Sequence, residues 1–461
     1  MTLIKSISGI RGTIGGKPND NFTPIDIVRF TAAYGTYILS NNTVSKSTVV
    51  VGRDARISGS MVQALVSNTL IGLGINVIDL GMATTPTVEM VVPNENAQGG
   101  IILTASHNPK QWNALKLLDG NGEFLNAEAG AKILDLAEKE DFNFATIDDL
   151  GTVTIKKTAL EMHIQTVLNH PLVDVESIKS RGFKIVVDGV NSIGGIAIPL
   201  LLRKFDIEVI ELYCVPNGNF PHNPEPLKEH LSDLSQKIID TNSDLGIVVD
   251  PDVDRLAFMD EYGDMFGEEY TLVACADYVL SKKPGNTVSN ISSTRALRDV
   301  TEKYGGNYYG SSVGEVNVVS KMKEVNAVIG GEGNGGIIDP ELHYGRDSLI
   351  GTALFLSLLS NVKVSVSQLK KTYPEYFMSK GKIEIEPSMD VDHLLVNIEK
   401  KYVDLNPNTI DGVKIDFKKY WVHLRKSNTE PIIRVYTEAH SQSEADDLMN
   451  RFKKELLDLG S

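Results

Sequence analysis

The feature that most constrains the fold of this chain is a short apolar run, rich in valine and isoleucine, that recurs along the sequence. Such runs occur at 48–52, 75–80, 99–103, 184–189, 207–212, 245–250 and 327–331. Most of them end in glycine or polar residues, which is typical of buried strands. The segments 58–73 and 127–139 instead carry apolar residues at helical spacing. The alternation of the two patterns predicts an α/β architecture.

The order of these runs indicates a weak internal repeat of an α/β unit, about one hundred residues long and used about three times. Any α/β protein shows some similarity of this kind, so the repeat stays a hypothesis. From about residue 370 the pattern changes. Residues 382–386 alternate polar and apolar side chains, and 441–458 has the spacing of an amphipathic helix. We therefore expect a distinct α+β domain at the C-terminal end.

Charge and cysteine content exclude several classes of protein. The chain has 45 Lys and Arg against 60 Asp and Glu, a net charge of −15. A general nucleic-acid binder needs a basic face, whereas an anionic small substrate needs only a local cationic cluster. Two cysteines allow no disulfide framework. The start of the chain lacks a signal-peptide pattern, and no apolar run approaches the ~20 residues of a membrane span. We expect a cytoplasmic protein.

The hexapeptide 104–109, Thr-Ala-Ser-His-Asn-Pro, carries the strongest chemical signal. It directly follows the apolar run 99–103, so Ser106 lies at the carboxyl end of a strand, where open α/β sheets bind ligands. The following Asn-Pro pair favours a turn that holds the serine off the regular backbone. A serine hydroxyl needs a base or an electrophilic partner to react, and the alternative is a serine that only caps a turn.

Three carboxylates, Asp250, Asp252 and Asp254, follow another apolar run at alternate positions. At a separation of ~4 Å and an effective dielectric constant near 20, each pair repels by roughly 4 kcal/mol, so their convergence requires a cation. An EF-hand would add Glu261, but Arg255 stands where that loop needs glycine. The pattern favours a small Mg²⁺ site open to a phosphate oxygen, and the alternative is a solvated acidic turn.

Two further loops have side chains that suit a phosphorylated sugar. Residues 425–431, Arg-Lys-Ser-Asn-Thr-Glu-Pro, combine a guanidinium, hydroxyls and an amide, and Arg434 could add a second fork. Residues 331–336, Gly-Glu-Gly-Asn-Gly-Gly, allow a ligand to approach closely, and Glu332 with Asn334 suits sugar hydroxyls. No Walker A ending follows this loop. Either segment could instead be a surface turn.

Two other functions stay open at this point. Residues 310–314 match the G-x-S-x-G nucleophile elbow, and histidines at 343, 393, 423 and 440 keep the chain order of a serine hydrolase with Ser312 possible. The other alternative is a protein that binds a cation or a sugar phosphate without catalysis and never carries phosphate on Ser106.

Taken together, these segments resemble the α-D-phosphohexomutase family of phosphoglucomutases, phosphomannomutases and phosphoglucosamine mutases. The matching segments are 8–12, 52–56, 104–109 with Asn113 and Lys116, 250–255, 313–314, 331–335 and 425–431. The resemblance implies four domains around a central cleft. Three related α/β domains with mixed sheets would span 1–151, 152–254 and 255–368, and a smaller α+β domain would span 369–461.

The resemblance also implies roles for individual residues. Those expected to hold one Mg²⁺, with Ser106 phosphorylated, are Ser106, Asp250, Asp252 and Asp254. Those expected at the reacting centre are Arg11, His107, Arg255 and Lys116, the last as the proton shuttle. Glu332 and Asn334 would contact sugar hydroxyls. Those expected to hold the non-reacting phosphate are Arg425, Ser427, Asn428, Thr429 and Arg434.

The reaction implied by the resemblance transfers the phosphoryl group of phospho-Ser106 to a hexose phosphate. The resulting 1,6-bisphosphate turns around, and its other phosphate returns to Ser106. A hexose 1,6-bisphosphate would therefore be an activator. The expected partner is a hexose phosphate rather than a nucleic acid or a membrane, and the expected state is a monomer or a homodimer.

Two departures from the family pattern bear on the choice of sugar. Asn334 stands where many relatives have serine, and Gly336 stands where several have histidine, for which His343 could substitute. The asparagine and the segment 313–315 favour a phosphoglucosamine mutase, which converts glucosamine 6-phosphate to glucosamine 1-phosphate. The alternative is a phosphoglucomutase/phosphomannomutase of dual specificity. Such choices depend on a few contacts of ~1–3 kcal/mol each.

Overall fold

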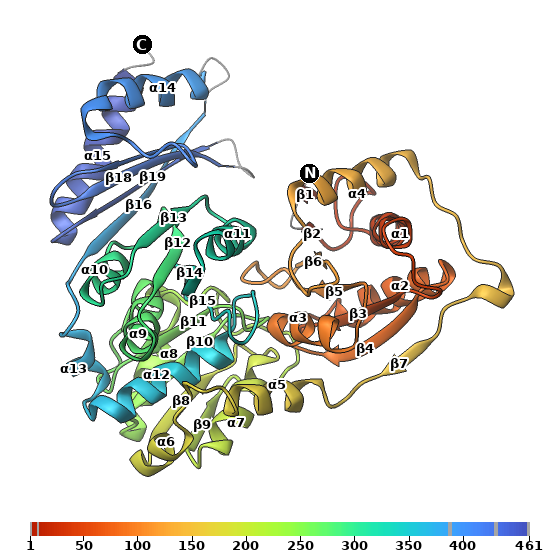
Figure 1. Ribbon diagram of the computed structural model, residues 1–461, viewed down its shortest axis with the longest axis horizontal. Coiled ribbons are helices and arrows are strands. Elements are labelled where there is room, and N and C mark those ends of the chain that lie inside the picture. Colours follow the sequence, from red (N-terminus) through yellow and green to blue (C-terminus); the bar gives the residue numbers. More distant parts are fainter. Residues whose placement is uncertain (1, 7–8, 386–389, 428–431, 459–461) are drawn as a thin grey trace.

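The part of the chain that the structure describes forms four β-sheets, each with its own helices (Figure 1). A computed structural model describes residues 2–6, 9–385, 390–427 and 432–458. One sheet has seven strands and the other three have four each. Three mixed α/β units and a smaller C-terminal unit with an antiparallel sheet confirm the predicted fold class.

The first unit is built on the seven-stranded sheet, in the order β1-β2-β6-β5-β3-β4-β7. Its strands are β1 (Ile4–Ser6), β2 (Gly9–Thr13), β3 (Thr48–Arg53), β4 (Asn76–Met82), β5 (Gly99–Leu103), β6 (Trp112–Leu118) and β7 (Val153–Ile155). Its helices are α1 (Pro24–Ser40), α2 (Gly59–Gly72), α3 (Thr85–Asn94), α4 (Ala127–Lys139) and the 3-10 helix η1 (Ile147–Asp149). The predicted strand 99–103 and helix 127–139 match β5 and α4.

The second and third units each contain a four-stranded sheet. The second has β8 (Lys184–Asp188), β9 (Glu208–Leu212), β10 (Leu245–Val249), β11 (Leu256–Met259), α5 (Ala159–Leu168), α6 (Val175–Arg181), α7 (Gly194–Lys204), η2 (Lys228–His230) and α8 (Ser232–Thr241). The third has β12 (Asn286–Asn290), β13 (Tyr308–Ser311), β14 (Ala327–Glu332), β15 (Gly336–Ile338), α9 (Glu268–Lys282), α10 (Ala296–Lys303), α11 (Glu315–Val325), α12 (Ser348–Val362) and α13 (Val366–Lys370).

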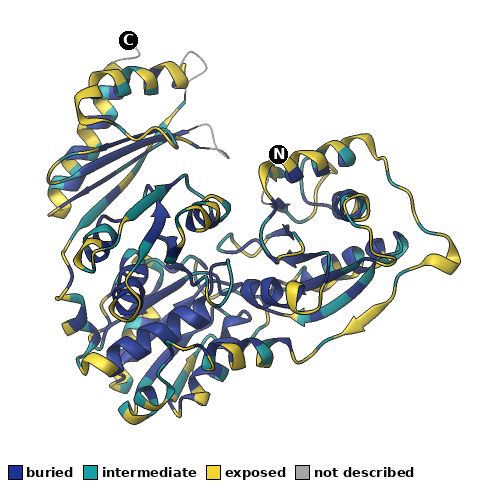
Figure 2. Cartoon of the chain, in the orientation of Figure 1, coloured by how far each residue is buried: buried dark blue, intermediate teal, exposed yellow. Residues whose placement is uncertain are grey.

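The two units share one hydrophobic core, in which helix α12 is central. Thirteen consecutive residues of this helix, 348–360, are buried, and Phe355 stacks on Phe258 of β11 at 3.8 Å between ring centroids. Figure 2 shows the continuous buried interior of these two units, with exposed residues on their outer helices. Because burial of large apolar side chains stabilises their packing, this shared core holds the second and third units together.

The same four-strand arrangement occurs in all three α/β units. In each, two parallel strand pairs are followed by an antiparallel strand: β4-β3-β5-β6, β9-β8-β10-β11 and β13-β12-β14-β15. This topology supports the internal repeat predicted from the sequence. It also places the loops β5–β6, β10–β11 and β14–β15 at one equivalent position of the repeat.

Two sheets extend past the predicted domain boundaries. Strand β7 pairs with β4, so the first sheet continues to Ile155, beyond residue 151. Strand β11 pairs with β10, so the second sheet continues to Met259, beyond residue 254. In both places the strand after the boundary completes the preceding sheet.

The fourth unit has an antiparallel sheet in the order β16-β19-β18-β17. Its elements are β16 (Phe377–Glu384), β17 (Val413–Asp416), β18 (Trp421–Lys426), β19 (Ile432–Ala439), α14 (Val391–Lys401), η3 (Val403–Leu405) and α15 (Gln442–Asp458). Helices α14 and α15 lie beside this sheet in Figure 1, and their apolar residues pack on it in a separate core. Within the described part of the chain, no helix is long and apolar enough to cross a membrane.

Candidate active site

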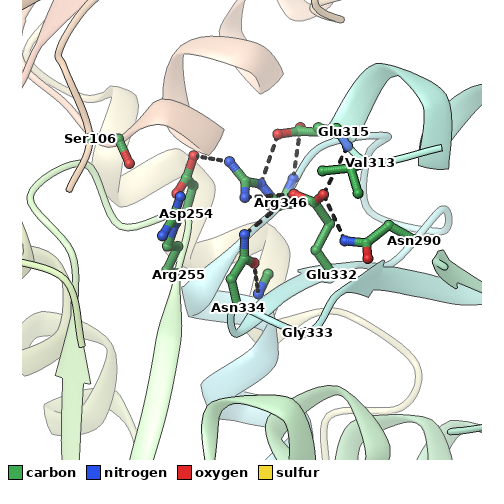
Figure 3. Close-up of polar contacts among 12 residues, drawn as sticks. Ser106, Asp254, Arg255, Asn290, Val313, Glu315, Glu332, Gly333, Asn334 and Arg346 are labelled. Atoms are coloured by element: carbon green, nitrogen blue, oxygen red, sulfur yellow. Dashed lines mark hydrogen bonds and ion pairs between the residues drawn. The ribbon is translucent and has the colours of Figure 1, made fainter. Parts of the chain in front are cut away.

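The three equivalent loops of the α/β units meet at one place. The Ser106 hydroxyl donates to Oδ2 of Asp250 at 2.7 Å, which joins the β5–β6 loop to the β10–β11 loop. The backbone N–H of Leu256, at the end of the β10–β11 loop, donates to the carbonyl of Gly335 in the β14–β15 loop at 3.0 Å. Figure 3 shows Ser106, Asp254 and Asn334, one residue from each loop. The repeat therefore brings together the motifs at 104–109, 250–255 and 331–336, which lie far apart in the sequence.

Ser106 is held in an unusual backbone conformation. Its φ is +48°, in the left-handed region that non-glycine residues seldom adopt. Its N–H donates to Oγ1 of Thr104 at 2.9 Å, and Thr104 donates to Oδ2 of Asp54 at 2.7 Å. The residue is 7% exposed. Strain of this kind persists where surrounding contacts fix it, and here it directs the hydroxyl toward Asp250.

A buried arginine behind the serine loop fixes its shape. Arg56, which is 1% exposed, forms an ion pair with Asp54 at 3.0 Å. Its guanidinium also donates to the carbonyls of Ser106, Asn108, Pro109 and Trp112. Arg56 belongs to the sequence motif 52–56, from which no role for it was predicted. The signal for it was the Arg-Asp-Ala-Arg segment directly after a predicted strand.

Asp250, Asp252 and Asp254 converge as predicted. Each offers a carboxylate oxygen within 4.8 Å of the others, and all three residues are fully buried. Val253, between two of them, has φ +66°, which is a strained conformation for a β-branched residue. Oδ1 of Asp252 and Oδ1 of Asp254 have no hydrogen-bond partner among the described residues. Buried acceptors without partners fit a divalent cation with oxygen ligands, so the triad could hold a metal.

The EF-hand alternative does not fit this loop. Glu261 accepts hydrogen bonds from the hydroxyls of Ser365 and Ser367 and is therefore engaged at a different place. Residues 256–259, which an EF-hand loop would include, form strand β11.

Lys116 supplies a positive charge to the triad. Its Nζ lies 2.7 Å from Oδ2 of Asp252 and 3.1 Å from Oδ2 of Asp254. Burial alone would lower the pKa of Lys116, but these two carboxylates raise it above its usual value. Burial, followed by repulsion from Asp252 and Asp254, raises the pKa of Asp250 well above its usual range. Asp252 and Asp254 are thus compensated by the Lys116 ammonium group, whereas Asp250 contacts the Ser106 hydroxyl.

Three further predicted residues, His107, Arg255 and Arg11, lie near one another, because the charges of both arginines act on the pKa of His107. His107 Nδ1 lies 3.4 Å from the Ser106 Oγ, and burial, with Arg255 nearby, lowers the pKa of His107 to about 2. Arg255 pairs with Glu225 at 2.9 Å. Burial and the charge of Arg255 also lower the pKa of Arg11. Nε of each arginine is buried without a partner among the described residues. A neutral histidine and two arginines with free donors suit an anionic group.

The β14–β15 loop, with the predicted sugar contacts Glu332 and Asn334, is fixed by contacts to Glu332. Its Oε1 accepts from Asn290 Nδ2 at 3.0 Å and from the Gly314 N–H at 3.1 Å. Asn334 Nδ2 lies 3.4 Å from Oε2, and Asn334 Oδ1 accepts from the Gly336 N–H at 3.2 Å. Gly335 has φ +86°, and a Cβ there would lie 2.2 Å from the Leu256 carbonyl oxygen. Glycine is required at that point.

Arg346, which was not predicted from the sequence, links two of the loops. It is 8% exposed and pairs with Asp254, Glu315 and Glu332. Burial alone would lower the pKa of Arg346, but these carboxylates raise it well above its usual value. The same guanidinium, with Lys116, counteracts the effect of burial and holds the pKa of Asp254 below its usual value. Arg346 lies before α12 in a loop with no local motif, so no sequence signal indicated it.

The predicted phosphate-binding residues lie in the fourth unit. Arg425 on β18 is the register partner of Arg434 on β19, so the two arginines face each other across one strand pair. Arg425 pairs with Asp411 at 3.0 Å, and Asp411 accepts from the Val313 N–H at 2.9 Å, next to the Gly314 that binds Glu332. Ser427 is 8% exposed. Asn428 and Thr429 lie outside the described residues.

The structure does not favour the serine-hydrolase alternative. The Ser312 hydroxyl donates to the Ile410 carbonyl at 2.9 Å, so it is not paired with a base. His423 contacts Ser292 and the Asp411 carbonyl. His343 lies 3.3 Å from Asp347 and 3.5 Å from Glu89. Its two ring nitrogens therefore face those carboxylates rather than an incoming sugar.

Comparisons with known proteins match all four units of the chain to one family. Domains I, II and III of the phosphoglucomutase/phosphomannomutase family match residues 3–144, 161–263 and 267–376, and its C-terminal domain matches 382–455. A phosphoglucomutase/phosphomannomutase of Thermococcus kodakarensis is 35% identical over 95% of this chain and 96% of its own. A phosphoglucosamine/phosphogalactosamine mutase of Sulfurisphaera tokodaii is 32% identical over 97% of each.

The fold has solved counterparts as well. A phosphoglucomutase/phosphomannomutase family protein of Burkholderia thailandensis superposes with a TM-score of 0.85 at 23% identity, covering 99% of this chain and 97% of that one. The four matched domains, in order and over nearly the whole length, settle the family. The chain therefore belongs to the phosphoglucomutase/phosphomannomutase family, and it is a phosphohexomutase, an isomerase that moves a phosphoryl group within a hexose phosphate.

Proposed function

We propose that this phosphohexomutase interconverts glucosamine 6-phosphate and glucosamine 1-phosphate, with Ser106 as the residue that carries the phosphoryl group. The observation that supports the proposal most is the contact of Ser106 with Asp250, inside a buried carboxylate triad and beside Lys116. A hydroxyl in this position can exchange a phosphoryl group with a sugar hydroxyl, and the surrounding cations stabilise the charge that develops on it.

The triad would hold Mg²⁺ together with a phosphoserine oxygen. The unpartnered Oδ1 atoms of Asp252 and Asp254 support this assignment. When bound, Mg²⁺ would neutralise charge on the transferring phosphoryl group. Arg11 and Arg255, whose Nε groups have no partner among the described residues, would hold the phosphoryl oxygens of Ser106 in the same place.

Lys116 would manage the proton of the sugar hydroxyl. Two carboxylates hold its proton in the structure, so in this state it acts as a cation and a proton donor. To accept the proton of an attacking hydroxyl, Lys116 must first leave Asp252 and Asp254 and give up one proton of its ammonium group to solvent. His107, whose lowered pKa keeps it neutral, would contribute a hydrogen bond rather than a charge.

The bisphosphate intermediate must present either of its two phosphates to Ser106. A fixed anchor for the other phosphate makes this possible, and Arg425, Ser427 and Arg434 supply donors for it in the fourth unit. Asn428 and Thr429 complete the proposed anchor. Free hexose 1,6-bisphosphate would act as an activator, because it can phosphorylate Ser106 before turnover begins.

The proposed sugar follows from the loop chemistry and from relatives. Glu332 and Asn334 present a carboxylate and an amide to the sugar, which suit a substrate with an amino group. The relative from Sulfurisphaera tokodaii is named for glucosamine and galactosamine phosphates. The alternative, a dual glucose and mannose specificity, has the support of the relative from Thermococcus kodakarensis.

A side-by-side turnover assay tests the proposal. Glucosamine 6-phosphate, glucose 1-phosphate and mannose 1-phosphate are compared with Mg²⁺ and a trace of the corresponding bisphosphate. We expect the highest kcat/KM for the glucosamine substrate and loss of nearly all turnover in Ser106→Ala. Ser180→Ala, on the outside of α6, is the matched control and should retain turnover. Full activity of Ser106→Ala would overturn the role of Ser106, and the lowest kcat/KM for glucosamine would overturn the proposed sugar.

A further inference from the structure

Arg346 occupies a position between two functional groups of the site that otherwise do not touch. Its Nη2 donates to Oδ2 of Asp254 at 2.8 Å, its Nη1 to Oε2 of Glu332 at 3.0 Å and its Nε to Oε2 of Glu315 at 2.9 Å. Figure 3 shows the guanidinium between the three carboxylates. One side chain therefore connects the proposed metal triad to the proposed sugar loop.

The path of Arg346 depends on a glycine. A Cβ at Gly336 would lie 2.3 Å from Cδ of Arg346 and 3.0 Å from its Cγ. The arginine thus fills the space that a side chain at position 336 would need. The Arg346 backbone N–H also donates to Oε1 of Glu315 at 3.1 Å, so both ends of the residue are fixed to the first turn of α11.

Glu332 has little freedom in this arrangement. Its Oε1 has two donors, Asn290 and the Gly314 N–H, and its Oε2 has Arg346 and the longer contact to Asn334. The ion pair with Arg346 is the only one of these four contacts that crosses to the metal triad. A guanidinium can serve three carboxylates at once because its N–H groups point in fixed, separate directions, whereas an ammonium is a point charge.

We propose that Arg346 is a positioning residue with two opposite effects. It orients Glu332 for the sugar, and it competes with the divalent cation for Asp254. The inference rests on the proposed function, because it takes the triad as the Mg²⁺ site and Glu332 as a sugar contact. Loss of the cationic side chain should free Asp254 and remove a positive charge next to the metal. The same loss should release Glu332 and weaken binding of the hexose phosphate.

Two variants separate the charge of Arg346 from its shape. In Arg346→Gln, titration calorimetry with MgCl₂ alone should show binding about 10-fold tighter than in the wild type, because a nearby cation is removed. The KM for the hexose phosphate should rise about 10-fold, the loss of one charge-assisted hydrogen bond. In Arg346→Lys the charge remains, so Mg²⁺ affinity should stay within about threefold of the wild type. Its KM should still rise, because the fork is lost.

The controls keep the outcomes distinct. Arg203→Gln removes the same charge from an exposed ion pair on α7 and should leave Mg²⁺ affinity and KM unchanged. A merely structural role would weaken Mg²⁺ and substrate binding together, and that result, or unchanged Mg²⁺ affinity in Arg346→Gln, would overturn the proposal. If Arg346→Gln does not fold by circular dichroism, Arg346→Lys decides through its KM, and an unchanged KM overturns the proposal. A wild-type chain that binds no Mg²⁺ would instead contradict the proposed function.

Discussion

At the scale of the residue, the backbone conformation of Ser106 depends on side chains that lie behind its loop. Ser106 has an unfavourable backbone conformation, and the cost of such a conformation is on the order of 1–3 kcal/mol. The contacts from Arg56 to four carbonyls of its loop offset that cost. Arg56 is itself compensated by Asp54. The geometry of the serine loop is therefore determined by a buried ion pair behind it.

Removal of that arginine should destabilise the whole chain. In Arg56→Gln, Asp54 becomes a buried carboxylate without its cation, and the loss in free energy of unfolding should be about 3–5 kcal/mol. Denaturant unfolding measures it, with Arg203→Gln as the exposed control. A loss below about 1 kcal/mol in Arg56→Gln would show that the pair does not support the loop.

The site residues that could be predicted from the sequence are those that lie next to other site residues in the chain. Ser106 and the three aspartates lie in contiguous motifs after apolar runs, so a local pattern indicates them. Arg346, Glu315 and Glu225 reach the site from separate loops or helix starts, and only tertiary structure brings them there. The roles of Asn428 and Thr429 stay predictions.

At the scale of the element, one loop of the repeat, at the same position in each of the three α/β units, carries most of the candidate site residues. The loops β5–β6, β10–β11 and β14–β15 provide Ser106, the carboxylate triad and the residues proposed to contact the sugar. Sequence periodicity predicted β5 and β10 because their apolar runs are continuous. It did not predict β1, β2 or β6. Strand β1 has only three residues, glycines interrupt β2, and Asn113 and Lys116 interrupt the apolar pattern of β6. Pairing with neighbouring strands, rather than local preference, determines those elements.

The contact between the third and fourth units includes a titratable group. His423 on β18 is fully buried, with Nδ1 2.9 Å from the Ser292 hydroxyl and Nε2 2.6 Å from the Asp411 carbonyl. Burial lowers the pKa of His423 to about 4, whereas the unfolded chain has the ordinary value near 6.5. Between these values the unfolded state binds more protons, so stability rises with pH.

A pH series of unfolding tests this interface. The contribution of His423 should be complete above pH ~6.5 and should decrease by up to about 3 kcal/mol as the pH falls to ~4. In His423→Gln, which keeps polar atoms but does not titrate there, the decrease should be smaller by that amount. Equal pH dependence of the two proteins would contradict the assignment.

At the scale of the whole molecule, an acidic chain handles a phosphorylated substrate through local charge. The net charge is −15, yet Arg11, Lys116, Arg255 and Arg346 gather around one serine from three domains. Buried networks also join these domains. Asp347 accepts from His163 at 2.8 Å and pairs with His343, while Arg295 connects the third unit to Glu438 and Phe417 of the fourth. The sequence predicted four units. The pairing of β7 with β4 and of β11 with β10 carries two of the sheets past the predicted boundaries at 151 and 254.

The central claim, that Ser106 carries the transferred phosphoryl group, has one direct measurement. The wild-type chain and Ser106→Ala are incubated with glucose 1,6-bisphosphate and Mg²⁺, and mass spectrometry of the intact chains and of their peptides locates any added phosphate. The account predicts one phosphoryl group on the wild-type chain, in the peptide that contains Ser106, and none on Ser106→Ala. A phosphoryl group on another residue, or turnover of hexose phosphate by a chain that never carries one, would contradict it.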